Sequence, residues 1–484
     1  MKLVILVVAV GLAATRVSNP LLGEHTFRQS MVASNIEAFV AKGNSLVPAL
    51  PNKDHSTTLF DFPFYQWLAA AVGKLTGLSA AESGRIVNLA LFALTFLLLD
   101  DVMARTSVTA PQRMFSLALF AFAPLTLFDY SALFPDVLAI ALSIASLGAY
   151  LRSEEATRPA RRYGWFLAVI GFSVTCLFIK NPVYLPVMSA IVVQRWASKG
   201  WRSVCSRDLV LLGTTSVATI ITFKIVSAHI NGSELFAAWE RYWFFSNWAD
   251  RTAPDHYVVL AKWIGSRILN PLTLVCAAGG VGLLWHSHHP YRGLYVGWLG
   301  GCLLVTAIFF NLHWRHDYYL LPFVFPLAFP VGYLLGSLWD KLQRSESTRT
   351  LRVVGLLALA AVSGVFSWTY YQKMTPAPIE PLENGRWIQS HTGKGDFVIY
   401  VLAQYTWAPT YLYFAKRDGF NLSVANLSLS HVEEIRRTYG SKYRTLYLYV
   451  PHELEDQVGA MPALHAVRIV RDPDRGSLRQ LTDG

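Results

Sequence analysis

The stretch RIVNLALFALTFLLL, Arg85–Leu99, decides the class of this protein. After its first residue it runs for fourteen positions without a charge. Such a run is typical of a helix that crosses a bilayer, which needs about 20 mostly apolar residues. The composition agrees, because 53% of the 484 residues are hydrophobic, only 15% are charged and the mean hydropathy is +0.35. A soluble core of this size cannot bury so much apolar surface, so the sequence predicts an integral membrane protein.

Further apolar runs along the chain predict an α-helical polytopic membrane protein with about 11 transmembrane helices. They are Leu3–Thr15, Met114–Phe128, Val137–Leu151, Trp165–Ile179, Val183–Val193, Leu209–Val226, Leu269–Trp285, Leu294–Phe310, Tyr319–Leu338 and Val353–Trp368. The first run has the length of a signal-peptide core, but no clean cleavage site of small residues follows it. We therefore expect it to be retained as a helix, with a cleaved signal peptide as the alternative.

Positive residues gather in alternate loops between these runs. They are Arg105, Arg113, Arg152, Arg158, Arg161, Arg162, Arg195, Lys199, Arg202, Arg207, Arg292, Lys341, Arg344, Arg349 and Arg352. By the positive-inside rule these loops are cytoplasmic, which explains the net charge of +11 without nucleic acid as a partner. We expect a multi-pass protein of the bacterial cytoplasmic (inner) membrane whose first long loop and C-terminal segment face the periplasm or exterior. The cysteines agree, because Cys176, Cys276 and Cys302 lie in predicted spans and Cys205 in a cytoplasmic loop, so no exported thiol is present to be oxidised.

The C-terminal segment has the pattern of a small soluble domain. DFVIYV and YRTLYLYVP alternate as strands do, whereas APTYLYFAKRDG and SHVEEIRRTYG favour helices. Pro376, Pro378 and Pro381 indicate a linker after the last span. We predict a transmembrane domain over residues 1–371, including a first exported loop at 16–84 with juxtamembrane helices, and an extracytoplasmic α/β domain over residues 372–484.

The first exported loop contains the polar stretch GEHTFRQSMVASN, residues 23–35. Thr26 followed by Gln29 matches a capping box, which predicts a helix from Phe27 to the stop at Gly43. Glu24 then lies just ahead of a helix N-terminus, where backbone amides and the helix dipole favour the ionised carboxylate that a general base needs. The structural alternative is that Glu24 only satisfies the helix dipole or pairs with Arg28.

Arg28 and Asn35 lie seven positions apart and are expected on one side of this helix, where they present a cation and an amide near the acid. His25 and Gln29 complete the group of polar side chains in this stretch. We predict that His25, Arg28 and Gln29 bind substrate beside Glu24.

A second polar group lies in FDFPFYQWLAA, residues 60–70. Asp61 precedes Pro63, which favours a helix start at that point. Its aromatic residues would anchor at the membrane interface, and Gln66 would turn toward the loop. Asp61 is the second candidate for the catalytic carboxylate, and an interfacial anchor without catalytic function is the alternative.

A third polar group is NLHWRHDYYLLP, residues 311–322, in a short outward loop. Arg315 and His316 are placed to meet an anionic headgroup, and Tyr318 and Tyr319 suit a sugar-stacking surface or an aromatic belt. Lys180 in FIKNPVY is another cation at an outer helix end, as Asp136 in LFPDVLA is an acid at one. The alternative for each charge is that it is only solvated at the interface.

One chemistry uses all these features. A sugar linked to a lipid phosphate carries its own leaving group, so its transfer needs a carboxylate to take the acceptor proton, cations for the departing phosphate and an apolar groove for the lipid. Glu24 is the expected base, with Asp61 in reserve, and Arg28, Lys180, Arg315 and His316 compete for the phosphate. No cofactor is predicted from the residues, and a divalent metal stays an open alternative.

The same stretches carry a resemblance to a known superfamily. HTFRQS opening a helix, FDFPFYQWLAA before the second span, AESGRIVNLA within it, FPD, FIKNP and HDYYLLP together resemble the bacterial GT-C glycosyltransferases, from about Leu3 to Leu338. Among these the chain is similar to the protein O-mannosyltransferase-like family that contains the lipid A aminoarabinose transferases.

The resemblance implies a GT-C fold and an inverting transfer from a polyprenyl-phosphate sugar to an envelope glycolipid, polysaccharide or protein. It places the catalytic acid of the first exported loop at Glu24. The family's KPP-like element aligns with Phe62 and Pro63, where Asp61 stands in place of the expected lysine. The family's acidic pair corresponds to Glu24 and His25.

Other classes of protein stay open as alternatives. A flippase or transporter would be expected to place ionisable residues near mid-membrane in paired repeats. A lipid-linked glycan polymerase or ligase would rely on a large exported loop late in the chain, whereas here the first loop is rich in polar residues. A non-catalytic envelope scaffold would keep its function without Glu24 and Asp61.

Overall fold

The computed structural model describes residues 1–47, 50–53, 59, 61–231, 248–342, 349–374, 379–404, 409–459 and 466–481. Contacts divide the chain into two compact units. The helical unit comprises Met1–Ser18, Phe60–Tyr65 and Arg85–Met374, and the sheet unit comprises Asn19–Leu59, Gln66–Gly84 and Thr375–Gly484. The predicted division into residues 1–371 and 372–484 stays a prediction.

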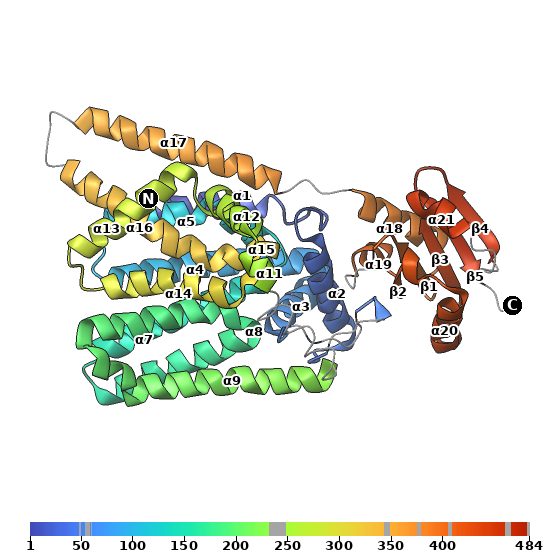
Figure 1. Ribbon diagram of the computed structural model, residues 1–484, viewed down its shortest axis with the longest axis horizontal. Coiled ribbons are helices and arrows are strands. Elements are labelled where there is room, and N and C mark those ends of the chain that lie inside the picture. The colour runs from blue at the N-terminus through green and yellow to red at the C-terminus, as the bar shows by residue number, and fades with distance from the viewer. Residues whose placement is uncertain are drawn as a thin grey trace. The chain divides into compact units, whose positions relative to one another are not determined.

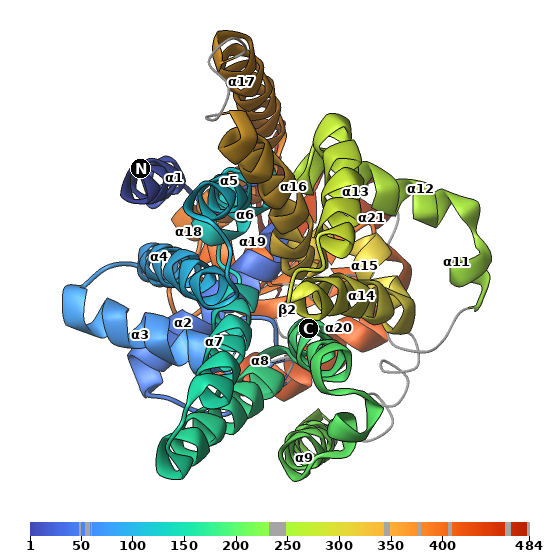
Figure 2. The ribbon, with the colours of Figure 1, turned by 90° about the vertical axis from the view of Figure 1, so that its left-hand side faces the viewer.

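The helical unit is a bundle whose main helices lie side by side in Figure 1 and are seen nearly end on in Figure 2. Within it α7 packs along α8, α8 along α14, and α16 along both α5 and α13. Its helices are α1 (Lys2–Ala14), α4 (Ala80–Arg105), α5 (Ala110–Ala121), α6 (Pro124–Ser131), α7 (Asp136–Glu155), α8 (Pro159–Lys199), α9 (Arg207–Asn231), α11 (Trp248–Thr252), α12 (Pro254–Trp263), α13 (Pro271–His286), α14 (Arg292–Ile308), α15 (Phe310–Arg315), α16 (Leu321–Leu342) and α17 (Arg349–Lys373).

The long element α8 folds back on itself at Lys180. The backbone of Lys180 is extended, with φ −159° and ψ 92°, so helical geometry is broken there. Near one end of α8 Arg162 lies 3.7 Å from Asp208, and near the other end Arg195 lies 2.7 Å from the same carboxylate. A continuous helix would separate these arginines by about 50 Å. The runs predicted at Trp165–Ile179 and Val183–Val193 are therefore two helices with Lys180 at the turn.

Five described helices are long and apolar enough to cross a membrane: Ala80–Arg105, Asp136–Glu155, Pro159–Lys199, Arg207–Asn231 and Asp317–Leu342. The number rises to seven if each of two bent helix pairs forms one span. One pair, α5 with α6, bends by 59° because Pro124 starts a new helix inside the predicted run Met114–Phe128. The chain is thus a helical membrane protein, but the prediction of about eleven spans is not confirmed.

Glycines spaced four residues apart let the helices of this bundle approach closely. On α16, a Cβ atom added at Gly332 would lie 2.1 Å from the Ser116 hydroxyl oxygen, and one at Gly336 would lie 2.4 Å from Cα of Gln112. On α14, Gly293, Gly297 and Gly301 meet α8 in the same way. Small residues with this spacing are the usual means of packing helices in a membrane, where lipid supplies no hydrophobic drive for association.

The cations of several predicted cytoplasmic loops gather at one end of the helical unit. Arg105 and Arg152 both pair with Asp101, and Arg105 also pairs with Glu155. Next along the chain, Arg195 and Lys199 both pair with Glu154. Because Arg195 and Lys180 lie at opposite ends of the same helix, this charged end is remote from the turn at Lys180.

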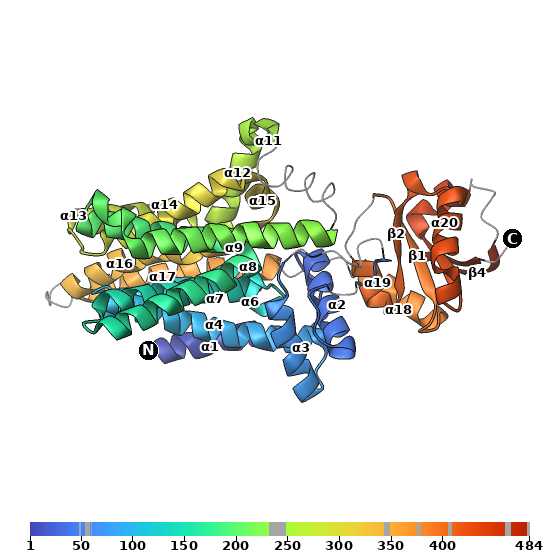
Figure 3. The same cartoon turned by 90° about the horizontal axis from the view of Figure 1, so that it is seen from below.

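The sheet unit contains one five-stranded sheet with the order β2-β1-β3-β5-β4, seen from below in Figure 3. The strands are β1 (Phe397–Leu402), β2 (Asp418–Ser423), β3 (Leu446–Pro451), β4 (Ala466–Asp472) and β5 (Gly476–Leu481). Strands β2, β1 and β3 are parallel, whereas β5 is antiparallel to both β3 and β4. The helices of the unit are α2 (Thr26–Lys42), most of α3 (Phe64–Thr76), α18 (Glu380–His391), α19 (Thr410–Ala415), α20 (Leu429–Tyr439) and α21 (Glu455–Gly459).

Side chains alternate between the two faces of the sheet, and both faces are covered. Phe397, Ile399 and Val401 pack with Val432 and Ile435 of α20. On the opposite face, Val398, Tyr400 and Leu402 pack with Trp387 and Ile388 of α18 and with Leu412 of α19. Burial on both faces gives the uninterrupted apolar run of β1.

The four elements predicted in the C-terminal segment are confirmed as β1, α19, α20 and β3. Pro381, one of the predicted linker prolines, lies in the first turn of α18 and not in a linker. Proline is tolerated there because the backbone amide that it lacks would have no hydrogen-bond partner within the helix. Pro376 and Pro378 lie outside the described residues.

Candidate active site

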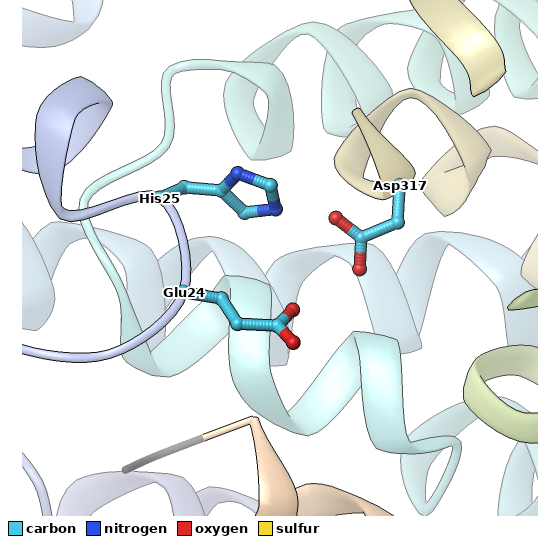
Figure 4. Close-up of side chains that lie close together, drawn as sticks. All are labelled: Glu24, His25 and Asp317. Atoms are coloured by element: carbon cyan, nitrogen blue, oxygen red, sulfur yellow. The ribbon is translucent and has the colours of Figure 1, made fainter. Parts of the chain in front are cut away.

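In the sheet unit, Glu24 and His25 lie in the turn that leads into α2. His25 precedes the helix in the left-handed conformation, with φ 57° and ψ 30°. This conformation is uncommon outside glycine and is kept where the surrounding structure fixes it. Both side chains are half-buried and extend from the turn to the same side in Figure 4.

The predicted helix is confirmed as Thr26–Lys42 with its stop at Gly43, but the predicted capping box is wrong. The hydroxyl of Thr26 donates to the Gly23 carbonyl at 2.6 Å, and the side-chain amide of Gln29 donates to the Glu24 carbonyl at 3.1 Å. Because the chain turns left-handed at His25, Thr26 is already inside the helix and cannot cap it. Both hydrogen bonds instead fix the backbone on either side of Glu24.

The other predicted residues of the sheet unit are buried. Arg28, Gln29 and Asn35 on α2 are exposed by 6% or less, and Gln66 on α3 by 2%. In the helical unit Tyr65 is fully buried, so the prediction that it anchors at the membrane interface is wrong. Trp67 remains partly exposed, and its indole donates to the Ser45 carbonyl at 3.1 Å.

In the helical unit, Lys180 joins two carboxylates. Its ammonium lies 3.1 Å from Asp61 and 3.9 Å from Asp136, which is the first residue of α7. All three side chains are exposed by 10% or less. Neither carboxylate oxygen of Asp136 accepts a hydrogen bond from a described residue. The ammonium of Lys180 is therefore shared between the carboxylates of Asp61 and Asp136. With all three groups ionised, these three side chains have a net negative charge.

The predicted residues of the loop at 311–322 continue from this cluster. The ammonium of Lys180 lies 5.0 Å from the centre of the Tyr319 ring. Tyr319 contacts the ring of Tyr318 at 4.7 Å, and Tyr318 stacks on His316 at 5.3 Å. The structure therefore brings Asp61, Lys180, Tyr319, Tyr318 and His316 into one continuous group.

Arg315, in the same loop, contacts an acid and an aromatic ring. Its guanidinium lies 3.6 Å from Asp250 and 4.4 Å from the centre of the Trp314 ring.

Sequence reasoning missed two charged residues, one in this loop and one that pairs with it. Asp317, also labelled in Figure 4, is 1% exposed and pairs with Arg267. Arg267 lies in a π-helical turn (Ile264–Ile268), an irregularity frequent at functional sites. Asp317 stands in the quoted stretch HDYYLLP, but its partner is 50 residues distant and no local pattern links them.

Burial also changes the chemistry of His313 on α15. Its imidazole is removed from water, which lowers its pKa to about 4. Nδ1 lies 3.0 Å from the Phe309 carbonyl oxygen. His313 is therefore neutral at physiological pH and a structural member of this loop.

Comparison with known proteins identifies the architecture. A family described as "Predicted membrane protein (DUF2142)" matches residues 62–329, more than half of the chain. No curated protein matches the sequence.

Three solved structures of GT-C glycosyltransferases share the fold. ArnT from Cupriavidus metallidurans, bound to undecaprenyl phosphate, is 14% identical, with a TM-score of 0.65 over 98% of this chain and 97% of that chain. The Archaeoglobus fulgidus oligosaccharyltransferase, tethered to an acceptor peptide, is 12% identical, with a TM-score of 0.60 over 100% of this chain and 74% of that chain. The mycobacterial arabinofuranosyltransferase AftD is 15% identical, with a TM-score of 0.55 over 99% of this chain and 41% of that chain. The GT-C fold expected from the sequence motifs is thereby confirmed.

Proposed function

The chain belongs to the DUF2142 family of predicted membrane proteins, and from this membership and the GT-C fold we propose that it is a membrane glycosyltransferase. It transfers a sugar from a polyprenyl-phosphate donor to an envelope glycolipid, polysaccharide or protein. The observation that carries the proposal is the turn before α2, which presents the Glu24 carboxylate from a backbone fixed on both sides.

The proposed reaction is an inverting displacement. A hydroxyl or amide group of the acceptor attacks the anomeric carbon, and the bond from that carbon to the phosphate oxygen breaks. Its electron pair leaves with the polyprenyl phosphate, and the acceptor proton passes to Glu24. Asp61 is the second candidate for this base.

The polar side chains that the sequence singled out beside these acids and in the other exported stretches are proposed to bind substrate. They are His25, Arg28, Gln29, Gln66, Lys180, Arg315, His316, Tyr318 and Tyr319. Among the cations, Lys180 pairs with Asp61 and Arg315 pairs with Asp250. The candidates for contact with the leaving phosphate are Arg28, Lys180, Arg315 and His316. Tyr318 and Tyr319 offer ring faces on which a sugar can stack.

The orientation in the membrane is part of the proposal. The ion-paired cations at one end of the helical unit are the residues that the positive-inside rule assigns to the cytoplasm. The turn at Lys180 then faces the outer side of the cytoplasmic membrane. A donor and acceptor that meet there belong to the cell envelope.

The substitution Glu24→Gln tests the assigned base. We expect purified Glu24→Gln protein to bind undecaprenyl phosphate with wild-type affinity and to lose transfer from undecaprenyl-phosphate-linked sugars by at least about a hundredfold. Glu433→Gln, a change at an exposed acid on α20, is the matched control and should leave the chemistry at Glu24 in place. Wild-type turnover by Glu24→Gln would remove Glu24 from the mechanism.

A further inference from the structure

The C-terminal domain, residues 379–481, is attached to the segment that carries Glu24. Both belong to the sheet unit. We propose that this domain positions the catalytic loop, with Thr410 and Lys416 as positioning residues. The inference rests on the proposed function, because it assigns the domain a part in the transfer that Glu24 supports.

The first attachment joins α2 to α19. The hydroxyl oxygens of Ser30 and Thr410 are 3.1 Å apart and buried. The Ser30 hydroxyl also lies 3.0 Å from the Phe27 carbonyl oxygen, and either hydroxyl can be the donor between Ser30 and Thr410. Seven residues along α2, the carboxylate of Glu37 lies 2.6 Å from the ammonium of Lys416. The two contacts bracket α19, so the short helix lies along two turns of α2.

Lys416 is held in a conformation that its residue type disfavours. It ends α19 in the left-handed region, with φ 51° and ψ 44°, where glycine is the usual residue. Its ammonium lies 4.0 Å from the centre of the Tyr413 ring as well as beside Glu37. Arg417 secures the same turn by donating to the carbonyls of Gln389 and Thr392. The turn that aims Lys416 at α2 is thus fixed from both sides.

The second attachment joins the rest of the first loop to the sheet. Strand β2 is an edge strand, and the amide of Gly419 donates to the Pro51 carbonyl at 3.0 Å, with Asn52 bridging to Gly419 in parallel register. Asn52 is fully buried, and Lys53 lies 2.9 Å from Asp418. Backbone pairing of this kind fixes register and covers an edge that would otherwise be open.

These two attachments hold the loop on both sides of its midpoint. Glu24 is six residues before Ser30, at the start of the helix that Thr410 and Lys416 hold. Fixing the backbone of a free loop costs conformational entropy, so a loop that is already fixed presents its base without that cost during the reaction. The domain therefore acts on turnover through α2 rather than by contact with substrate.

A charge exchange in the full-length protein tests this inference. Lys416→Glu places two acids together, Lys416→Glu with Glu37→Lys restores an opposite pair, and Lys442→Glu makes the same charge change elsewhere on the domain. Thr410→Val removes the buried hydroxyl with little change of volume. The readouts are hydrogen exchange of the α2 amides and release of undecaprenyl phosphate from an undecaprenyl-phosphate-linked sugar, with bacterial membranes supplying the acceptor.

Lys416→Glu and Thr410→Val should speed exchange in α2 and lower kcat by roughly three- to tenfold at unchanged KM for the donor. The exchanged pair should restore kcat, and Lys442→Glu should match the wild type. Faster hydrogen exchange in α2 at the wild-type kcat would overturn the inference. A change in the KM for the acceptor alone would also overturn it, because the domain would then be an acceptor-binding module. Absence of release by the wild-type protein would instead refute the proposed function, while the exchange data would show an attachment that serves structure only.

Discussion

Replacing Lys180 by methionine should destabilise the helical unit far more than the same change at an exposed lysine. Lys180→Met leaves Asp61 and Asp136 without the ammonium that lies 3.1 Å and 3.9 Å from them, and their side chains are only 10% and 3% exposed. Removing one partner of a buried ion pair typically costs about 3–5 kcal/mol, because the remaining charge stays desolvated. For a protein of 484 residues we expect Tm to fall by roughly 3–5 °C.

Lys199→Met is the matched control on the same element α8. Lys199 also pairs with an acid, Glu154, but its side chain is 51% exposed, and such surface pairs contribute about 0–1 kcal/mol. Thermal unfolding in detergent, followed by tryptophan fluorescence, measures both variants. Adding Asp136→Asn to Lys180→Met should recover part of the loss, since it removes one of the two buried charges. Equal losses of Tm for Lys180→Met and Lys199→Met would refute the electrostatic reasoning.

Two further predictions concern the helical unit. Burial holds the pKa of His313 at about 4, below its unfolded value near 6.5, so the unfolded chain binds the extra proton. The contribution of neutral His313 to the free energy of unfolding should therefore be complete above pH 6.5 and fall by up to roughly 3 kcal/mol as the pH decreases to 4. The substitution His313→Gln should flatten this part of the pH profile, and an unchanged profile would contradict the assignment. Gly332→Ala should lower Tm by several degrees because its new Cβ would lie 2.1 Å from the Ser116 hydroxyl oxygen, whereas Gly300→Ala, with no atom within 4 Å, should not. Equal changes of Tm for Gly332→Ala and Gly300→Ala would show that Gly332 is not needed for the close packing of α16 on α5.

Features that depend on neighbouring residues were predictable from the sequence. The apolar runs located most helices, and the gap between two runs marked the turn at Lys180 where α8 folds back. Runs rich in β-branched and aromatic residues located β1 and β3. The strands β2, β4 and β5 were not predicted. The sequences of β2 and β5, DGFNLS and GSLRQL, mix glycine and polar residues and gain their burial only from the sheet.

Features that join distant parts of the chain could not be predicted. Lys180 and Asp61 are 119 residues apart, and Ser30 and Thr410 are 380 apart. The local capping pattern at Thr26 predicted the wrong hydrogen bonds. Because His25 adopts the left-handed conformation, the Thr26 hydroxyl donates to the Gly23 carbonyl and does not cap the helix. The residues of the candidate site were therefore recognised by type, while their pairing required the structure.

The most direct test of the central claim is release of undecaprenyl phosphate from undecaprenyl-phosphate-linked hexoses and pentoses by the purified wild-type protein. Bacterial membranes serve as the source of acceptor, and mass spectrometry quantifies the released lipid. The account predicts release from at least one donor, dependent on the added membranes and lost in Glu24→Gln. Release that never exceeds the rate without enzyme, from protein that is folded and binds undecaprenyl phosphate, would contradict it.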